Sequence, residues 1–151
     1  MNYLAHVYLS RENIDLAIGN FIADNIKGNN YKKFNINWQK GILLHRFIDS
    51  YTDSHYIFRE HSKLFFDSHR HYSRVLIDIF YDHFLAKNWK KYSHISLENF
   101  EFNFCKSLAQ NLNKFPNEMS NKIRFFIYQK WFTKYSSIKG LIYILEKMDN
   151  K

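Results

Sequence analysis

Residues 75–86 read VLIDIFYDHFLA, an apolar run in which only Asp78, Asp82 and His83 are strongly polar. The two aspartates are four residues apart, so in a helix they share one face. Burying a carboxylate costs several kcal/mol unless the group is paired or coordinated. A divalent metal, an arginine or a histidine could compensate these carboxylates, and Asp82 could instead bond a neighbouring turn.

A second apolar stretch, GILLHRFIDSYTD at residues 41–53, carries His45 and Asp49 with the same spacing of four. On a helical wheel the two residues lie on one stripe and can touch each other. Leu43 and Phe47 make the opposite side of the helix apolar as well. We therefore expect this helix to be buried nearly all round, with a histidine and an aspartate inside it.

Two further segments also place polar side chains among apolar ones. His6 lies within the apolar first helix, and Asn20 and Asp24 follow one edge of the second. Four helices thus each offer an imidazole or a carboxylate to a shared interior. Mixed histidine and aspartate ligands suit Mn²⁺, Mg²⁺, Fe or Zn²⁺ in a catalytic role, and the lack of thiolates argues against a closed structural zinc site.

Each of these residues also has a purely structural explanation. A single histidine or aspartate in an apolar helix is usually a core group with a hydrogen-bond partner. His45 could pair with Asp49, and Asp78 could pair with Arg46. Recurrence in four helices favours one shared metal site over several separate pairs. The other histidines lie in polar or mixed surroundings and are predicted to be surface residues: His55, His61, His69, His71 and His94.

The composition predicts one all-α domain over residues 1–151. The chain is 46% hydrophobic and 19% aromatic, which provides a core, and its 4 Gly and 1 Pro leave few helix breakers. Helical periodicity runs nearly from end to end, with a polar loop at residues 28–37. We predict helices at about residues 2–9, 13–27, 38–53, 55–66, 69–89, 96–112, 118–135 and 138–148.

The single Cys105 excludes an internal disulfide, fits a reducing compartment and is predicted to be a small buried hydrophobic residue. No segment has the pattern of a targeting peptide. Charged or polar residues interrupt every apolar run well before the roughly 18 residues that a membrane span needs. We therefore expect a cytoplasmic protein without a membrane partner.

The charge of the chain is strongly basic. Its 22 Lys and Arg against 14 Asp and Glu give a formal net charge of +8. Such a field attracts nucleic acid, an acidic protein or a phosphorylated ligand. The chain is also rich in Asn, Lys, Ile, Tyr and Phe, the amino acids of AT-rich codons, which offers a neutral explanation for part of the lysine excess. Charge alone therefore does not identify the partner.

In four segments the chain resembles the bacterial acyl carrier protein phosphodiesterases, also called acyl carrier protein hydrolases. The matching segments are residues 1–10 (MNYLAHVYLS), 18–28 (IGNFIADNIKG), 41–55 (GILLHRFIDSYTDSH) and 77–89 (IDIFYDHFLAKNW). After about residue 95 the resemblance weakens and rests mainly on the helical pattern and on WFTKY at residues 131–135. Family chains are longer, so the C-terminus at Lys151 is shorter than the family pattern.

The resemblance implies a divergent HD-type phosphohydrolase, a compact multi-helix bundle with a divalent metal in its core. It implies hydrolysis of the phosphodiester that links 4′-phosphopantetheine to a serine of acyl carrier protein. Mn²⁺ is the favoured metal, with Mg²⁺ or Fe²⁺ as alternatives. The acidic carrier protein, rather than nucleic acid, would then be the partner that the basic charge attracts. The adjacent His-Asp doublet of HD enzymes is absent, and this chain has Asp82-His83 and the spaced pair His45 and Asp49 instead.

We therefore predict a metal-activated water as the nucleophile. The predicted metal ligands are His6, Asp24, His45 and Asp78. Asp49 and His83 are the predicted catalytic residues, either holding a ligating imidazole in its tautomer or protonating the serine oxygen. Asn20 and Arg46 are the predicted substrate-binding residues: Asn20 would orient the nucleophile or a ligand, and Arg46 would bind a phosphate oxygen. A cationic docking rim is predicted from two groups of lysines: Lys27, Lys32 and Lys33, and Lys87, Lys90 and Lys91.

Other functions remain as alternatives at this point. An HD-like hydrolase of another phosphoester, such as a nucleotide, would keep the site and change the substrate. A non-enzymatic helical module that binds nucleic acid would explain the charge, but the chain has no helix-turn-helix, zinc-finger or RNP-type signature. An inactive family member is a further alternative, prompted by the short C-terminus.

Overall fold

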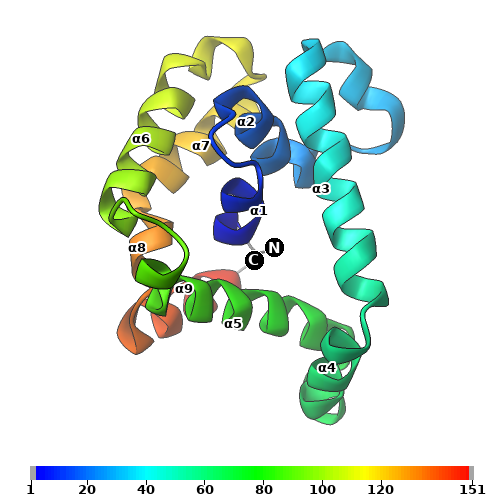
Figure 1. Ribbon diagram of the computed structural model, residues 1–151. Helices are drawn as coiled ribbons and strands as arrows, with labels where there is room; N and C mark the ends of the chain where they lie inside the picture. The colour runs from blue at the N-terminus through cyan, green and yellow to red at the C-terminus, as the bar shows by residue number, and fades with distance from the viewer. Residues whose placement is uncertain (1–2, 150–151) are drawn as a thin grey trace. The chain divides into compact units, whose positions relative to one another are not determined.

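The computed structural model describes residues 3–149, which form α-helices and short 3₁₀ turns without any β-strand. This confirms the predicted all-α class (Figure 1). The α-helices are α1 (Tyr3–Leu9), α2 (Ile14–Ile22), α3 (Ile36–Ser54), α4 (Tyr56–His69), α5 (Ser73–Lys87), α6 (Leu97–Gln110), α7 (Asn117–Gln129), α8 (Trp131–Tyr135) and α9 (Ile138–Asp149). The 3₁₀ turns are η1 (Ala23–Asn25), η2 (Gly28–Lys33), η3 (Arg70–Tyr72), η4 (Trp89–Lys91) and η5 (Leu112–Lys114).

The helices group into two compact units, Met1–Asp82 and His83–Lys151. Helix α5 contributes to both, because the boundary falls within it. The expectation of a single domain over residues 1–151 stays a prediction. Among the described residues 3–149, no helix combines the length and apolar character that a membrane crossing requires.

Side-chain caps set the starts of several helices. Asn13 accepts a hydrogen bond from the amide of Leu16 at the start of α2, and Ser96 accepts one from Asn99 at the start of α6. Asn35 accepts from the amides of Asn37 and Trp38, so α3 begins two residues before the predicted Trp38. Such caps bind amide groups that the first turn of a helix leaves unpaired.

Two predicted helices are divided in the structure. The helix expected at residues 13–27 ends at Ile22 and continues only as the turn η1, and part of the expected polar loop forms η2. The helix expected at residues 118–135 breaks at Lys130, which takes the left-handed conformation with φ of 50°. The buried carboxylate of Glu101 then accepts hydrogen bonds from the amides of Phe132 (2.7 Å) and Thr133 (3.2 Å), which starts α8.

Helices α2 and α3 pack side by side, with α2 in blue and α3 in cyan (Figure 1). Glycines make this close crossing possible. A Cβ on Gly41 would lie 2.7 Å from the amide nitrogen of Asn20 and 2.8 Å from Cα of Gly19. Because no side chain separates the backbones here, residues next to the contact on both helices lie within hydrogen-bonding reach of each other.

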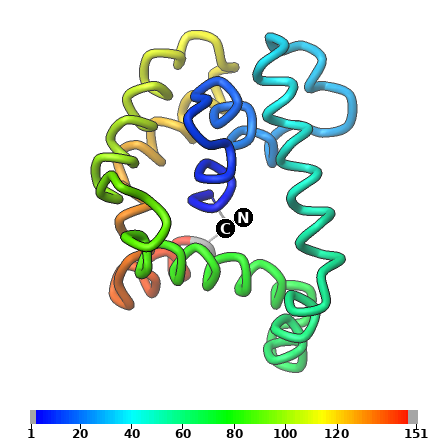
Figure 2. The backbone as a smooth tube through the Cα atoms, viewed as in Figure 1, coloured from blue at the N-terminus to red at the C-terminus, as the bar shows by residue number. Residues whose placement is uncertain are grey.

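Helix α3 is a long continuous helix that turns sharply into α4 (Figure 2). The expectation that it is buried nearly all round is wrong. Leu43 is 46% exposed and Phe47 68% exposed, whereas Trp38, Ile42 and His45 are buried. The helix therefore has one buried face, which carries the polar residues discussed below, and one exposed apolar face.

The second unit has a core of its own, rich in aromatic rings. Phe132 lies between Phe104 and Phe126, with ring centroids 5.8 and 5.4 Å apart respectively. Cys105 is buried beside this core, as predicted for a small hydrophobic residue. Burial raises the pKa of its thiol to about 12, with the charge of Glu101 as a second cause, so the cysteine is not a nucleophile at neutral pH.

Candidate metal centre

Three side chains of the first unit converge on one point. Nε2 of His6 lies 3.1 Å from Oδ1 of Asp49, and Nε2 of His45 lies 3.1 Å from Oδ2 of the same carboxylate. The two imidazoles are stacked, with centroids 4.0 Å apart and planes inclined by 17°. One ligand atom from each of these residues lies within 4.8 Å of the others. Helices α1 and α3 thus present two imidazoles to a single carboxylate.

Two residues of the α2–η1 segment complete the surroundings of His45. Oδ1 of Asp24 lies 3.1 Å from Nε2 of His45, and Oδ1 of Asn20 lies 3.1 Å from its Nδ1. The imidazoles of His6 and His45 are buried, whereas the carboxylates of Asp24 and Asp49 are about half exposed. The group therefore has a buried nitrogen side and a solvent-facing oxygen side, where a substrate can approach.

Contacts between the imidazoles and the carboxylates shift the pKa values of this group. Burial by itself would lower the pKa of His45, but hydrogen bonds and charges from Asp24 and Asp49 outweigh it and raise the pKa to about 9. Burial likewise opposes ionisation of Asp49, but hydrogen bonds and charges from His45 and His6 hold the pKa of this carboxyl well below its usual range. The pKa of Asp24 is also lowered, by His45 against the effect of burial. The carboxylates are charged at neutral pH and carry the negative charge that a cation needs.

His6 has a further feature that distinguishes it from a satisfied core histidine. Its Nδ1 is buried and has no hydrogen-bond partner among the described residues. Buried polar atoms are normally paired. The ring is therefore held through Nε2 at the shared carboxylate and by packing rather than by a hydrogen bond at each nitrogen.

The two aspartates of α5 have different surroundings. Asp82 is fully buried and accepts hydrogen bonds from the amides of Leu4 and Ala5, both 2.8 Å long. Its partner is thus the first turn of α1, which confirms the bond to a neighbouring turn that the sequence left open. Asp78 is half-buried, and its pKa is raised by burial, with the charge of Asp49 as a smaller cause. Asp78 therefore lies close enough to the carboxylate of Asp49 for the two charges to interact.

Two other predicted site residues have structural contacts. The guanidinium of Arg46 donates to the carbonyl oxygens of Ile26 (3.1 Å) and Gly28 (2.8 Å) and lies over the ring of Tyr31. It holds the segment after Asp24, and its predicted role on a phosphate stays a prediction. His83 is buried in the second unit, where its Nδ1 donates to the carbonyl oxygen of Tyr135 at 2.6 Å. Its predicted role in proton transfer also stays a prediction.

The donor set of His6, His45 and Asp49 fits a divalent cation. Metal–ligand bonds to imidazole and carboxylate are about 2.0–2.2 Å long, so two ligands of one ion lie about 3 Å apart. The two nitrogen–oxygen distances of 3.1 Å match this spacing. Nitrogen and oxygen donors without thiolates suit a catalytic ion, and the half-exposed carboxylates leave room for water.

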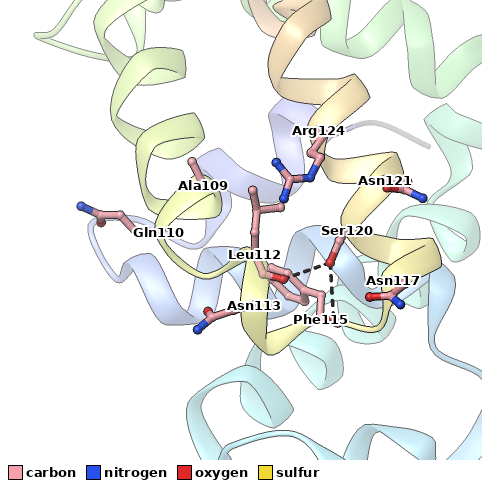
Figure 3. A pocket seen from close by; sticks show the side chains of 9 residues that line it. All are labelled: Ala109, Gln110, Leu112, Asn113, Phe115, Asn117, Ser120, Asn121 and Arg124. Atoms are coloured by element: carbon pink, nitrogen blue, oxygen red, sulfur yellow. Dashed lines mark hydrogen bonds between the residues drawn. The ribbon is translucent and has the colours of Figure 1, made fainter.

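The second unit carries an open pocket of about 750 Å³, but its chemistry differs (Figure 3). Amide side chains and Arg124 line it, and Ser120 at its wall donates to the carbonyl oxygens of Leu112 and Phe115. No histidine or carboxylate contributes to the lining. This pocket therefore offers no metal-ligating group.

Comparison with known proteins identifies the family. The family model for acyl carrier protein phosphodiesterase matches residues 1–151. The chain belongs to the acyl carrier protein phosphodiesterase family. The acyl carrier protein phosphodiesterase of Photorhabdus laumondii is 30% identical over 149 residues, which cover 98% of this chain and 75% of the relative. The protein of the same name from Pectobacterium atrosepticum is 29% identical, over 98% of this chain and 77% of its own length.

The match over the whole chain shows that the family resemblance continues beyond residue 95, where the sequence segments alone suggested that it weakens. No solved structure matches the chain. The family assignment therefore rests on sequence, and the arrangement of His6, His45 and Asp49 is an independent structural observation.

The sequence singled out His6, His45 and Asp49, and the structure brings these three side chains together. Of the two roles predicted for Asp49, its position between the two imidazoles fits contact with an imidazole. Sequence reasoning did not single out Ser10, which is buried and contacts Asn20 and the carbonyl oxygen of His6. A serine four residues after a histidine at the end of a short helix was the only available signal.

Proposed function

We propose that this chain hydrolyses the phosphodiester between 4′-phosphopantetheine and a serine of holo-acyl carrier protein. The products are apo-acyl carrier protein and free 4′-phosphopantetheine. The observation that carries the proposal is the convergence of His6, His45 and Asp49 in a chain of this family. Such a cluster suits hydrolysis of a phosphoester, because this reaction needs a cation near the phosphoryl oxygens and an activated water.

The proposed metal ligands are His6, His45 and Asp49, with Asp24 and Asp78 as further carboxylates at the same site. This retains the predicted ligands and adds Asp49, which the sequence analysis assigned to holding an imidazole or to acid or base chemistry. Mn²⁺ is the proposed ion, with Mg²⁺ or Fe²⁺ as alternatives. When bound, such an ion lowers the pKa of water and neutralises charge on the phosphoryl oxygens.

The chain's own residues supply the rest of the reaction. The oxygen of water forms a bond to phosphorus, the bond from phosphorus to the serine oxygen breaks, and that oxygen takes a proton. Half-exposed carboxylates on the open side of the group, such as Asp24, can accept the proton of the water. We retain His83 as the proposed donor to the serine oxygen and Arg46 as the proposed contact of the phosphate.

An acidic carrier protein also suits the charge of the chain. Between Glu118 and Glu146 the sequence contains five basic residues and no acidic one: Lys122, Arg124, Lys130, Lys134 and Lys139. The lysines predicted to form a docking rim are exposed, both in the first unit and in the second: Lys27, Lys32, Lys33, Lys87, Lys90 and Lys91. Opposite charges accelerate association and make its rate fall as salt is added.

The proposal is tested by incubating the protein with holo-acyl carrier protein and Mn²⁺ and measuring the mass of the carrier protein. The expected result is loss of the phosphopantetheine group, and a His45→Ala variant should abolish it. A panel of nucleotides and other phosphodiesters in parallel distinguishes the alternative substrates. Folded, metal-loaded protein that leaves the carrier protein intact would contradict the proposal.

A further inference from the structure

The orientation of the Asn20 side chain is fixed by its neighbours. Its Nδ2 donates to the carbonyl oxygen of His6 at 2.8 Å and to Oγ of Ser10 at 3.0 Å. Ser10 in turn donates its own proton to the same His6 carbonyl at 3.0 Å, which leaves its oxygen free to accept from Asn20. Because the carbonyl oxygen of His6 only accepts, the atom 2.8 Å from it is the Nδ2 donor, and Oδ1 faces His45.

The orientation of this amide determines where the proton of His45 lies. Oδ1 of Asn20 is an acceptor only, and Nδ1 of His45 lies 3.1 Å from it. Nδ1 must therefore carry the proton, and a neutral His45 has its lone pair on Nε2. This is the nitrogen that lies 3.1 Å from both Asp24 and Asp49, at the centre of the group.

From these contacts we propose that Ser10 and Asn20 are positioning residues that fix the Nδ1–H tautomer of His45 and so present Nε2 to the metal ion. The inference rests on the proposed function, because it assumes that His45 is a metal ligand. Of the roles predicted for Asn20, it selects the orientation of a ligand and names the mechanism. Partners of this kind orient ligating histidines and raise their basicity.

The backbone explains why Asn20 can reach His45. Gly19 precedes Asn20 on α2, and Gly41 lies one turn before His45 on α3. The close crossing at these two glycines brings the amide against the imidazole. Asn20 and His45 are both buried, and Ser10 is as well, so water does not replace these hydrogen bonds. A flipped amide would place Oδ1 against the carbonyl oxygen of His6, an acceptor against an acceptor.

The test compares two variants of Asn20 with the wild type, using Zn²⁺ as a diamagnetic probe. Asn20→Leu removes every hydrogen bond of the side chain, and we expect Zn²⁺ affinity to fall by roughly 10–100-fold. Asn20→Asp keeps an oxygen that accepts from Nδ1, so the tautomer should be retained. The tautomer of His45 is read from long-range proton–nitrogen NMR correlations of the Zn²⁺-loaded protein, which should show a protonated Nδ1 in the wild type and in Asn20→Asp.

Ser120→Ala is the matched control, because it removes buried hydrogen bonds in the second unit. It should lower stability without changing Zn²⁺ affinity. If Asn20→Leu does not fold, Ser10→Ala tests the same network and should weaken Zn²⁺ binding more than the control does.

An unchanged affinity and an unchanged tautomer in Asn20→Leu, or in Ser10→Ala where the former does not fold, would overturn this inference and leave the proposed function intact. A wild type that binds no Zn²⁺, Mn²⁺ or Mg²⁺ would overturn both the metal site and this inference. An Nε2–H tautomer in the Zn²⁺-loaded wild type would also contradict the assignment directly.

Discussion

The imidazoles of His6 and His45 stack at 4.0 Å although the two residues are on different helices and 39 positions apart in the sequence. Their Nε2 atoms contact the two oxygens of one carboxylate, that of Asp49. Two rings that each carry a proton on Nε2 can share the carboxylate in this way, and so can two rings that bind a cation together with it. The geometry therefore makes Asp49 the central member of the group.

This central position predicts that Asp49 contributes more to metal affinity than the other carboxylates do. Asp49→Asn should weaken Mn²⁺ binding by more than about 100-fold, since even partners outside the ligand set typically contribute 10–100-fold. Asp78→Asn should weaken it less, because Asp78 is not within the close group. Calorimetric titration and the metal content of the purified variants measure both effects.

The control for this comparison is Asp53→Asn, on the same helix and exposed, where the carboxylate pairs with Arg74. It should bind Mn²⁺ like the wild type. Wild-type affinity in Asp49→Asn would show that the group does not hold the ion.

Because the backbones of α2 and α3 meet at glycines, we expect one added methyl group to destabilise the fold strongly. In Gly41→Ala the new Cβ would meet the backbone of Leu16 and Asn20, which cannot move as a side chain can. We expect a loss of about 3 kcal/mol or more in the free energy of unfolding, at or above the usual cost of overpacking. Because the helices must separate, Asn20 should also lose contact with His45, and metal affinity should fall.

Gly28→Ala provides the matched comparison. Gly28 has a positive φ of 53° but no atom within 4 Å of its Cβ position, so the variant carries only the conformational cost of about 1 kcal/mol. Urea denaturation of both variants separates the two effects. Equal losses in the two variants would mean that the helix contact is not tight.

Much of the fold was predictable because it depends on local sequence. Scarcity of glycine and proline and nearly continuous helical periodicity predicted an all-α chain, and the spacing of His45 and Asp49 predicted their contact. The break at Lys130 was not predictable in this way, because neither a glycine nor a proline marks it. It depends on Glu101, which caps α8 from 31 residues earlier in the chain.

At the candidate site, too, some features follow from local sequence and others depend on distant residues. The sequence identified Asp82 as a buried carboxylate in need of a partner, and that was correct. Its partners are the amides of Leu4 and Ala5, which are 78 and 77 residues away. They carry no sequence signal, because every residue except proline has such an amide. Sequence pattern thus finds polar residues that need compensation, whereas tertiary packing decides what compensates them.

Lys130 offers a test of the helix break. Its φ of 50° and ψ of 62° place it in the left-handed region, which costs an L-residue about 1–2 kcal/mol relative to glycine. Lys130→Gly should raise the free energy of unfolding by roughly 0.5–1 kcal/mol, after the greater freedom of glycine in the unfolded chain is deducted. Lys130→Ala removes the side chain beyond Cβ and keeps the strain, so its free energy of unfolding should not exceed that of the wild type. A lower free energy of unfolding in Lys130→Gly would mean that contacts of the lysine side chain stabilise the fold by more than its backbone conformation costs.

The buried carboxyl of Asp82 should make the stability of the fold depend on pH. Burial raises the pKa of this carboxyl to about 7 in the folded protein, against the effect of its two amide hydrogen bonds, whereas an unfolded chain has a value of about 3.9. The folded state therefore binds a proton more tightly between these values. The contribution of Asp82 to stability is consequently largest at low pH and decreases as the pH rises from about 4 to about 7.

Asp82→Asn isolates this contribution, because it removes the titration and leaves the other carboxylates in place. We expect the variant to be less stable than the wild type at pH 5. The asparagine oxygen can accept from one of the two backbone amides, but its NH₂ group then faces the other amide, which is also a donor. The deficit should shrink by a few kcal/mol at pH 8, where the wild type carries the cost of a buried charge. Urea denaturation at both pH values measures it, and Gly28→Ala, which changes no titratable group, should show the same deficit at each. A deficit in Asp82→Asn that grows toward alkaline pH would show that the amides of α1 stabilise the carboxylate more than burial destabilises it.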